Sequence, residues 1–162
     1  PLIVMTPKSL LRHKSCVSNL EEFTNGQFNE FLDDPTPPKK AESLILCSGK
    51  IYYDLLQERE NIRSNKIAIV RVEQFYPFNE ERFNEVTKPY AKAKRIVWCQ
   101  EEPENMGAWN FLNPIFEKHL GLRPEYVGRT PTASPATGSL TLHRKEQAGI
   151  VNNALGISSN AS

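Results

Sequence analysis

A short Ser-Gly-Lys sequence is the first feature whose residue types could bind a ligand. Ser48, Gly49 and Lys50 follow an apolar, strand-like run and precede a segment with helical spacing. At such a junction, free backbone amides and the helix dipole can hold a phosphate group. The sequence is much shorter than a Walker loop or a Gly-x-Gly-x-x-Gly motif. We therefore favour a tight strand-to-helix turn that needs glycine, with phosphate binding as the alternative.

Three carboxylates follow another apolar run. Residues 100–105 contain Glu101, Glu102 and Glu104. Ligands of open α/β sheets bind at the carboxyl ends of strands, and paired carboxylates can act as acid and base or bind a divalent metal. No histidine lies nearby in the sequence to complete a transition-metal site, and glutamates before a helix also suit its dipole. A structural or interface role is favoured over catalysis.

A basic cluster lies near the start of the chain, at Lys8, Arg12, His13 and Lys14. Lys8 and Arg12 are four residues apart, so they could share one helical face. The cluster could bind an anionic ligand, or it could be an ordinary solvated face. The three histidines are far apart in the sequence, and no Ser-His-Asp or Cys-His set is visible.

Composition limits the class of protein. The chain has 162 residues, and 20 Lys and Arg against 19 Asp and Glu give a net charge of +1. This balance argues against a chain built to coat nucleic acid or an anionic membrane. No apolar run approaches the ~20 residues of a membrane span. Of the three cysteines, Cys47 and Cys99 lie in apolar runs, which indicates buried reduced thiols and a cytoplasm-like compartment.

The order of elements predicts one α/β domain. From residue 43 onward, short apolar runs alternate with segments of helical spacing, which is typical of an open, mostly parallel sheet with helices on both faces. Residues 24–42 have turn and linker composition. The five runs predicted as strands are 2–5, 43–47, 67–72, 95–100 and 125–129. The segments predicted as helices are 49–63, 79–90, 106–120 (one kinked helix or two, because of Pro114) and 143–155.

Five sequence strings, in this order and spacing, are specific when taken together. They are PLIVMTPKSLLRH at 1–13, CSGKIYYDL at 47–55, IVRVEQFYPF at 69–78, WCQEEP with NMGAW at 98–103 and 105–109, and YVGR with ASPATG at 126–129 and 133–138. Together they resemble one family, the E1 subunit of the 2-oxoglutarate dehydrogenase complex, at its C-terminal end. The Asn-Met-Gly sequence around Met106 also resembles the related 2-oxoadipate E1, so the choice between the two substrates stays open.

The resemblance implies a three-layer, transketolase C-terminal-like (Rossmann-like) α/β fold. It also implies that the sequence is the last part of a longer chain. Residues 1–14 would end the pyrimidine-binding domain, 15–40 would be a linker, 41–157 would be the transketolase C-terminal-like domain, and 158–162 would be a disordered tail.

The same resemblance places the catalytic machinery upstream. The family decarboxylates 2-oxoglutarate with thiamine diphosphate and Mg²⁺ and succinylates the lipoyl group of the E2 subunit in the citric acid cycle. Its cofactor motif and catalytic residues precede this segment. We therefore expect no catalytic, cofactor-binding or metal-binding residues here, and an isolated chain that is an inactive dimerisation and regulatory module. Expected partners are a second copy and E2, with no nucleic acid or membrane.

Some members of the family bind acetyl-CoA or AMP near the junction with the preceding domain. Lys8, Arg12 and Arg71 are the candidate effector-binding residues on this basis. The expected compartment is the bacterial cytoplasm or the mitochondrial matrix. A small, self-contained α/β protein that binds phosphate at Gly49 is the rival hypothesis.

Overall fold

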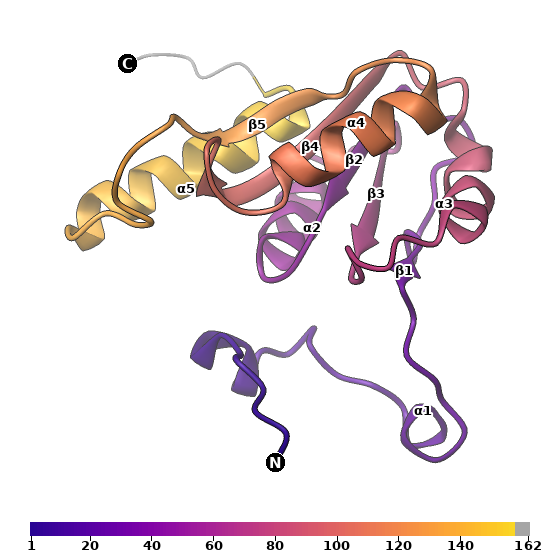
Figure 1. The fold of residues 1–162 in the computed structure, drawn as a ribbon, viewed down its shortest axis with the longest axis horizontal. Helices are drawn as coiled ribbons and strands as arrows, with labels where there is room; N and C mark the ends of the chain where they lie inside the picture. The colour runs from indigo at the N-terminus through magenta and orange to yellow at the C-terminus, as the bar shows by residue number, and fades with distance from the viewer. Residues whose placement is uncertain (158–162) are drawn as a thin grey trace.

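A five-stranded sheet forms the centre of the molecule. The computed structural model describes residues 1–157. The strands lie in the order β1-β3-β2-β4-β5 (Figure 1). Their bounds are β1 Phe31–Leu32, β2 Ser43–Cys47, β3 Ile67–Val72, β4 Arg95–Pro103 and β5 Glu125–Arg129. The helices are η1 Lys8–Arg12, α1 Leu20–Thr24, α2 Ile51–Asn61, α3 Glu80–Thr87, η2 Lys88–Tyr90, α4 Trp109–Leu120 and α5 Leu140–Leu155.

The predicted α/β class with a mostly parallel open sheet is confirmed. β2 pairs in parallel with both β3 and β4, and β4 pairs in parallel with β5. Among residues 1–157, only the pairing of β1 with β3 is antiparallel, with Phe31 opposite Val72. The carboxyl ends of four strands therefore meet at one edge of the sheet, which is where the sequence motifs at 48–50 and 100–105 lie.

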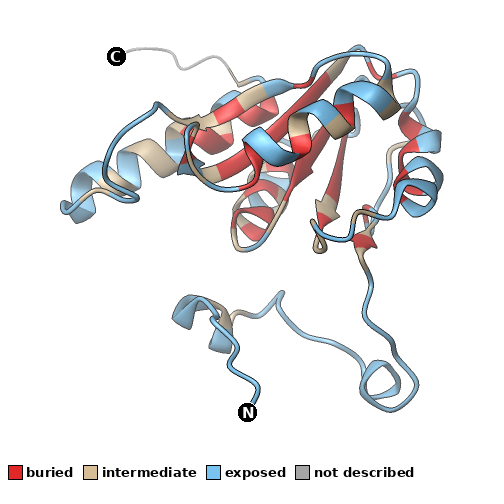
Figure 2. Ribbon diagram, in the orientation of Figure 1, coloured by how far each residue is buried: buried red, intermediate tan, exposed pale blue. Residues whose placement is uncertain are grey.

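Helices cover both faces of the sheet, so the domain has three layers (Figure 2). On one face, Leu55 of α2 and Val151 of α5 belong to one apolar cluster with strand residues such as Ile69 of β3. On the other face, α3 and α4 bury Phe83 and Phe116 beside Trp98. The strands are nearly continuous in apolar residues because both of their faces are covered.

Local signals in the sequence set the helix ends. The Asn79 side chain accepts a hydrogen bond from the Arg82 amide, at 3.0 Å, at the start of α3. Gly121 ends α4 with a φ of 71°, a left-handed conformation that glycine adopts without strain. Pro114 lies inside α4, which continues through it as one helix. The last helix begins at Leu140, earlier than residue 143, because Ser139 caps it.

One predicted strand is wrong, and a different segment takes its place. Residues 2–5 form no strand, and their side chains are exposed, because within residues 1–157 no backbone lies beside them to pair with. The antiparallel edge strand is instead Phe31–Leu32, inside the range predicted as a linker. The tail predicted at 158–162 lies outside the described residues.

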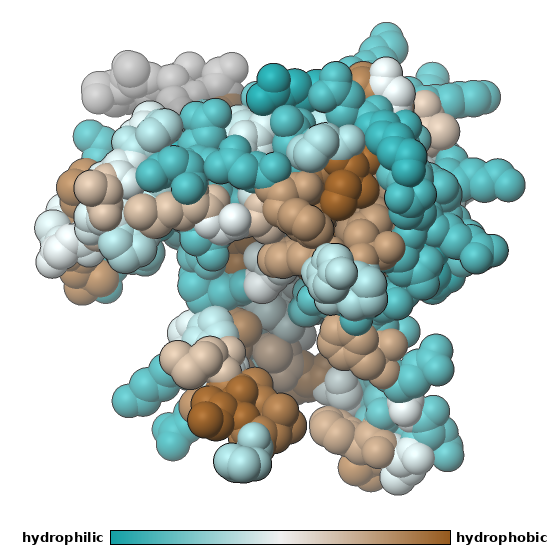
Figure 3. Space-filling model, in the orientation of Figure 1, coloured by the Kyte–Doolittle hydropathy of each residue, from teal (hydrophilic) through white to brown (hydrophobic). Residues whose placement is uncertain are grey.

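The N-terminal segment runs apart from the sheet and exposes many apolar side chains (Figures 1 and 3). Leu2, Met5 and Phe23 are examples, at 90%, 92% and 77% exposure. The segment does contact the body: Leu10 packs against the apolar cluster that includes Leu55 of α2, and the His13 ring lies 5.1 Å from the Tyr53 ring. Within residues 1–157, no helix is long and apolar enough to cross a membrane.

Candidate functional site

The two strand-end motifs line one cavity of about 580 Å³. Ser48, Gly49 and Lys50 reach it from the end of β2, and Glu101 and Glu102 reach it from β4. The parallel register of β2 and β4 brings the two motifs together at the carboxyl edge of the sheet. Aromatic and small residues complete the lining: Phe75, Tyr76, Trp98, Phe111, Gly107, Ala108 and Pro7.

Gly49 forms the turn at the base of this cavity. Its φ is 72°, and a Cβ added there would have no atom within 4 Å, so the backbone conformation and not crowding requires glycine. Lys50 Nζ lies 2.8 Å from Glu101 Oε1 and 3.6 Å from Asp54 Oδ2. Burial disfavours its charged form, but the contacts with Glu101 and Asp54 outweigh burial and raise the pKa of Lys50. The lysine therefore neutralises carboxylates, which favours the turn interpretation over a phosphate site.

The carboxylates at 101–104 do not form a metal site. Glu101 is paired with Lys50, and Glu102 is exposed. Within residues 1–157, no group of three or more His, Cys, Asp or Glu side chains lies close enough to hold a metal ion. These residues do not fit Mg²⁺ or a diphosphate, so we assign no metal ligand, cofactor-binding or catalytic residue to this edge.

A buried amide organises the wall of the cavity, and the sequence analysis did not single it out. Gln100 Oε1 accepts hydrogen bonds from Trp98 Nε1 at 2.8 Å and from the Trp109 amide at 3.2 Å. Its Nε2 donates to the Met106 carbonyl at 2.8 Å and the Pro103 carbonyl at 3.1 Å. One side chain thus fixes the loop between β4 and α4. A glutamine directly after an apolar strand was the only available signal.

Arg129 joins the end of β5 to α5. Its Nε donates to Glu146 Oε2 at 2.7 Å, its Nη2 lies 3.0 Å from His143 Nδ1, and its Nη1 donates to the Glu101 carbonyl. A guanidinium has no acceptor, so Nδ1 of His143 must be the unprotonated ring nitrogen in this arrangement. The group connects the carboxyl edge of the sheet with the first two turns of α5.

The three predicted effector residues are only partly brought together. Arg12 lines a hollow of about 450 Å³ with Tyr53, but Lys8 is exposed and outside that lining. Arg71 is held on β3, where its Nε donates to Glu73 Oε1 at 2.9 Å. Its guanidinium carbon lies 5.6 Å from the centre of the Tyr53 ring. Arg12 and Arg71 therefore both approach Tyr53, while Lys8 does not.

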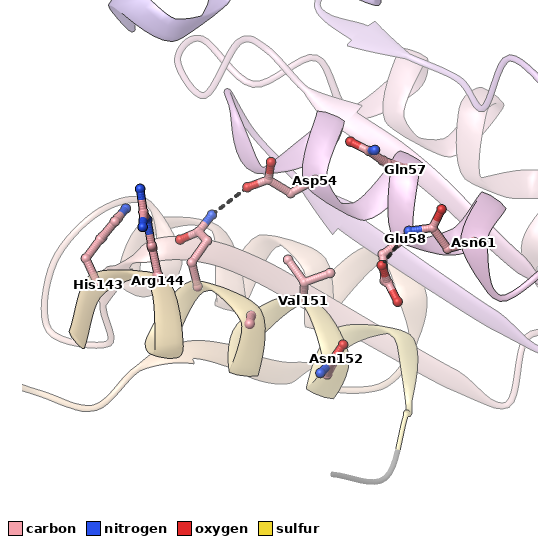
Figure 4. A pocket seen from close by; sticks show the side chains of 10 residues that line it. Asp54, Gln57, Glu58, Asn61, His143, Arg144, Val151 and Asn152 are labelled. Carbon is pink, nitrogen blue, oxygen red and sulfur yellow. Dashed lines mark hydrogen bonds between the residues drawn. The ribbon is translucent and has the colours of Figure 1, made fainter. Parts of the chain in front are cut away.

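A polar groove between α2 and α5 is a further hollow that the sequence did not predict (Figure 4). Its volume is about 570 Å³. Gln147 Nε2 donates to Asp54 Oδ2 at 2.8 Å across it, and His143 and Arg144 lie at one end. The hydrogen bond helps to hold the two helices of this layer together.

The sheet order, the antiparallel edge and the two helical layers define a three-layer α/β domain of the transketolase C-terminal kind. A solved structure described as "Split gene transketolase, inactive beta4 tetramer" is similar to the chain with a TM-score of 0.55. The similarity covers 81% of this chain and 43% of that one, at 14% sequence identity, and it supports the fold alone.

Sequence comparison then shows the family. The family model "2-oxoglutarate dehydrogenase C-terminal" matches residues 17–155, and the chain belongs to this family. The 2-oxoglutarate dehydrogenase E1 component of Azotobacter vinelandii is 47% identical over 161 residues. That of Haemophilus influenzae is 44% identical over 159 residues. These alignments cover 95% and 96% of the chain but only 17% of each relative. The resemblance found in the sequence is confirmed.

Proposed function

We propose that the chain is the C-terminal domain of a 2-oxoglutarate dehydrogenase E1 subunit, the component that decarboxylates 2-oxoglutarate and succinylates the lipoyl group of E2. One observation carries the proposal. Two relatives named as E1 components align with nearly all of this chain at 47% and 44% identity, yet the chain spans only 17% of the length of each. The domain contributes to assembly and regulation, and the reaction takes place on residues that this sequence does not contain.

The chemistry of the described residues supports this division. Thiamine diphosphate and Mg²⁺ supply the reactive carbanion of such an enzyme when they are bound. The glycine turn directly after β2, at Gly49, is followed by a lysine already paired with Glu101, and within residues 1–157 no acidic cluster suits a metal ion. The cofactors therefore belong to other parts of the full enzyme.

The exposed N-terminal segment supports a role in assembly. Leu2, Ile3, Val4 and Met5 are between 69% and 92% exposed, and contiguous apolar surface of this kind is typical of a surface that another element covers. We propose that the rest of the E1 subunit and a second copy cover it, in a homodimer that acts with E2. The corresponding compartment is the bacterial cytoplasm, or the mitochondrial matrix in a eukaryote.

The activity assay that tests the proposal compares two proteins. In the first, the chain is joined to the remainder of its E1 subunit, and in the second it is alone. We expect ferricyanide reduction that depends on 2-oxoglutarate, thiamine diphosphate and Mg²⁺ only from the first. Turnover by the chain alone would contradict the proposal. A kcat/KM higher for 2-oxoadipate than for 2-oxoglutarate would instead support the substrate indicated by the Asn-Met-Gly sequence.

Regulation at the N-terminal hollow is a further part of the proposal. Arg12 and Arg71 approach Tyr53, and two arginines suit phosphate recognition by acetyl-CoA or AMP, with Lys8 as an outer contact. An Arg12→Ala variant of the full enzyme should lose most of its response to acetyl-CoA. An unchanged response would remove Arg12 from the effector site.

A further inference from the structure

A basic hollow of about 720 Å³ lies at the opposite edge of the sheet, at the amino ends of β2 and β3. Its lining combines the segment before β2, with Lys39 and Lys40, and the turn between α2 and β3, with Arg63 and Lys66. None of these residues belongs to the cavities at the carboxyl edge. The proposed function leaves this hollow without a role.

A buried ion pair makes one wall of the hollow rigid. Asp34 and Arg59 are 5% and 4% exposed and form a salt bridge beneath the surface. Asp34 Oδ1 also accepts a hydrogen bond from the Thr36 amide at 2.9 Å, and Arg59 Nη2 donates to Thr36 Oγ1 at 2.9 Å. Thr36 leads directly into Pro37 and Pro38, whose fixed φ angles stiffen the same wall. Both terminal nitrogens of Arg59 are engaged in this support, since Nη1 also donates to the Ile67 carbonyl at 3.0 Å.

The remaining cations are more numerous than the carboxylates around them. Two carboxylates line the hollow: Glu42, whose Oε1 lies 3.0 Å from Lys66 Nζ, and Glu60. Within residues 1–157, no ion pair joins Lys39, Lys40 or Arg63 to either of them. The hydrogen bond with Lys66 lowers the pKa of Glu42, and the charges of Lys40 and Lys94 lower it further. Lys94, at the start of β4, therefore extends the positive field beyond the hollow.

The turn that presents Arg63 is unusual. Arg63 has a φ of 51° and ends α2, where its amide donates to the Glu60 carbonyl at 2.9 Å and the Ser64 amide donates to the Arg59 carbonyl at 3.1 Å. These two hydrogen bonds form the Schellman arrangement, in which glycine is the usual residue at the left-handed position. The chain instead places a long cationic side chain there, directed by a strained backbone toward the hollow's rim.

We propose that this hollow is a docking surface for an acidic polypeptide segment. The cations project from three separate loops, before β2, after α2 and before β4, so they match several carboxylates spread along a chain better than one compact anion. No aromatic side chain lines the hollow, so it lacks the stacking surface typical of single-stranded nucleic-acid sites. Exposed lysines and arginines around a rigid base provide charge complementarity and fast association.

The test measures the Kd of a fluorescein-labelled hexaglutamate peptide by fluorescence anisotropy. The first variant, Lys39→Gln/Lys40→Gln/Arg63→Gln, removes three charges from the hollow. The matched control, Arg123→Gln/Arg144→Gln/Lys145→Gln, removes three exposed charges elsewhere. We expect the first variant to raise Kd by about tenfold or more and the control to change it by less than about twofold.

Two further arms keep the test decisive. Arg63→Gly retains the left-handed turn while removing one charge, so it should weaken binding even if the triple variant folds poorly. Equal losses in the hollow variant and the control would overturn the proposal, because the peptide would then respond only to net charge. Complete displacement of the peptide by inorganic phosphate, or tighter hollow-dependent binding of an oligo-dT strand, would also overturn it in favour of a small anion or a nucleic acid.

Discussion

Replacing Asp34 with asparagine should destabilise the domain strongly, although the side chain hardly changes shape. Asp34 Oδ1 accepts from Arg59 Nη2 at 3.1 Å and from the Thr36 amide, while Oδ2 accepts from Arg59 Nη1 and from the Ile69 amide at 2.8 Å. An asparagine must place its NH₂ group against one of these two pairs of donors. One hydrogen bond to arginine and one to a backbone amide are lost, and the Arg59 charge stays buried without a counter-ion.

The expected cost follows from those losses. Two hydrogen bonds to a charged group contribute about 3–6 kcal/mol together. Breaking a buried ion pair from one side typically costs about 3–5 kcal/mol. We therefore expect a loss of about 3–5 kcal/mol out of a total of about 5–15 kcal/mol, with Tm lower by roughly 6–20 °C. Urea unfolding followed by the fluorescence of the buried Trp98 and Trp109 measures this change.

The neighbouring Asp33 provides the matched control. Its Oδ1 accepts both the Tyr90 hydroxyl at 2.6 Å and the Asp34 amide at 2.7 Å, so an asparagine can retain both hydrogen bonds through its own carbonyl oxygen. Asp33→Asn should cost no more than about 1 kcal/mol. If Asp34→Asn costs as little as Asp33→Asn, the buried ion pair does not stabilise this edge of the sheet as described.

Four other outcomes are expected from the described residues. Gly128→Ala should cost about 1–3 kcal/mol in urea unfolding, because its Cβ would overlap the Tyr126 hydroxyl. Gly149 lies in α5 with no atom near the position of an added Cβ, so Gly149→Ala should instead raise the free energy of unfolding by about 0.5–1 kcal/mol. A lower free energy of unfolding for Gly149→Ala would contradict this reasoning. Burial raises the pKa of Cys99 to about 12. At pH 8 a thiol reagent should therefore label one cysteine per native chain, the exposed Cys16. Rapid labelling of a second cysteine would be contrary evidence. Burial also raises the pKa of Tyr126 to about 12. The stability that the neutral Tyr126 hydroxyl contributes is complete below the unfolded pKa of about 10 and is lost as the pH rises to 12. Over that interval the wild type should therefore lose more stability than Tyr126→Phe, and parallel pH curves of the two proteins would refute this.

The parallel strands were predictable because both of their faces are buried. Residues 67–72 are nearly all apolar, and such runs between segments of helical spacing indicate a covered parallel sheet. The antiparallel strand Phe31–Leu32 was not predictable, since two residues carry no periodic pattern and its pairing with β3 is a tertiary contact. Residues 2–5 are as apolar as a strand, but a strand forms only where another backbone accepts and donates its hydrogen bonds.

The sequence analysis placed both motifs correctly at the ends of predicted strands. The parallel register of β2 and β4 then brings these two strand ends together. Their chemistry depends on contacts that the sequence does not show. The pairing of Lys50 with Glu101 joins residues from two motifs, and the ion pair of Asp34 with Arg59 joins a loop to a helix across the sheet edge. In the sequence, Gln100 is simply a polar residue at a strand end, but in the structure its side-chain amide fixes the following loop.

Isothermal titration calorimetry of the isolated chain with thiamine diphosphate and Mg²⁺ tests most directly whether this domain lacks a cofactor site, as the proposed function requires. We expect no heat beyond that of dilution, in a chain whose near-ultraviolet circular dichroism shows packed aromatic side chains. Saturable heat with a stoichiometry of one cofactor per chain would contradict it.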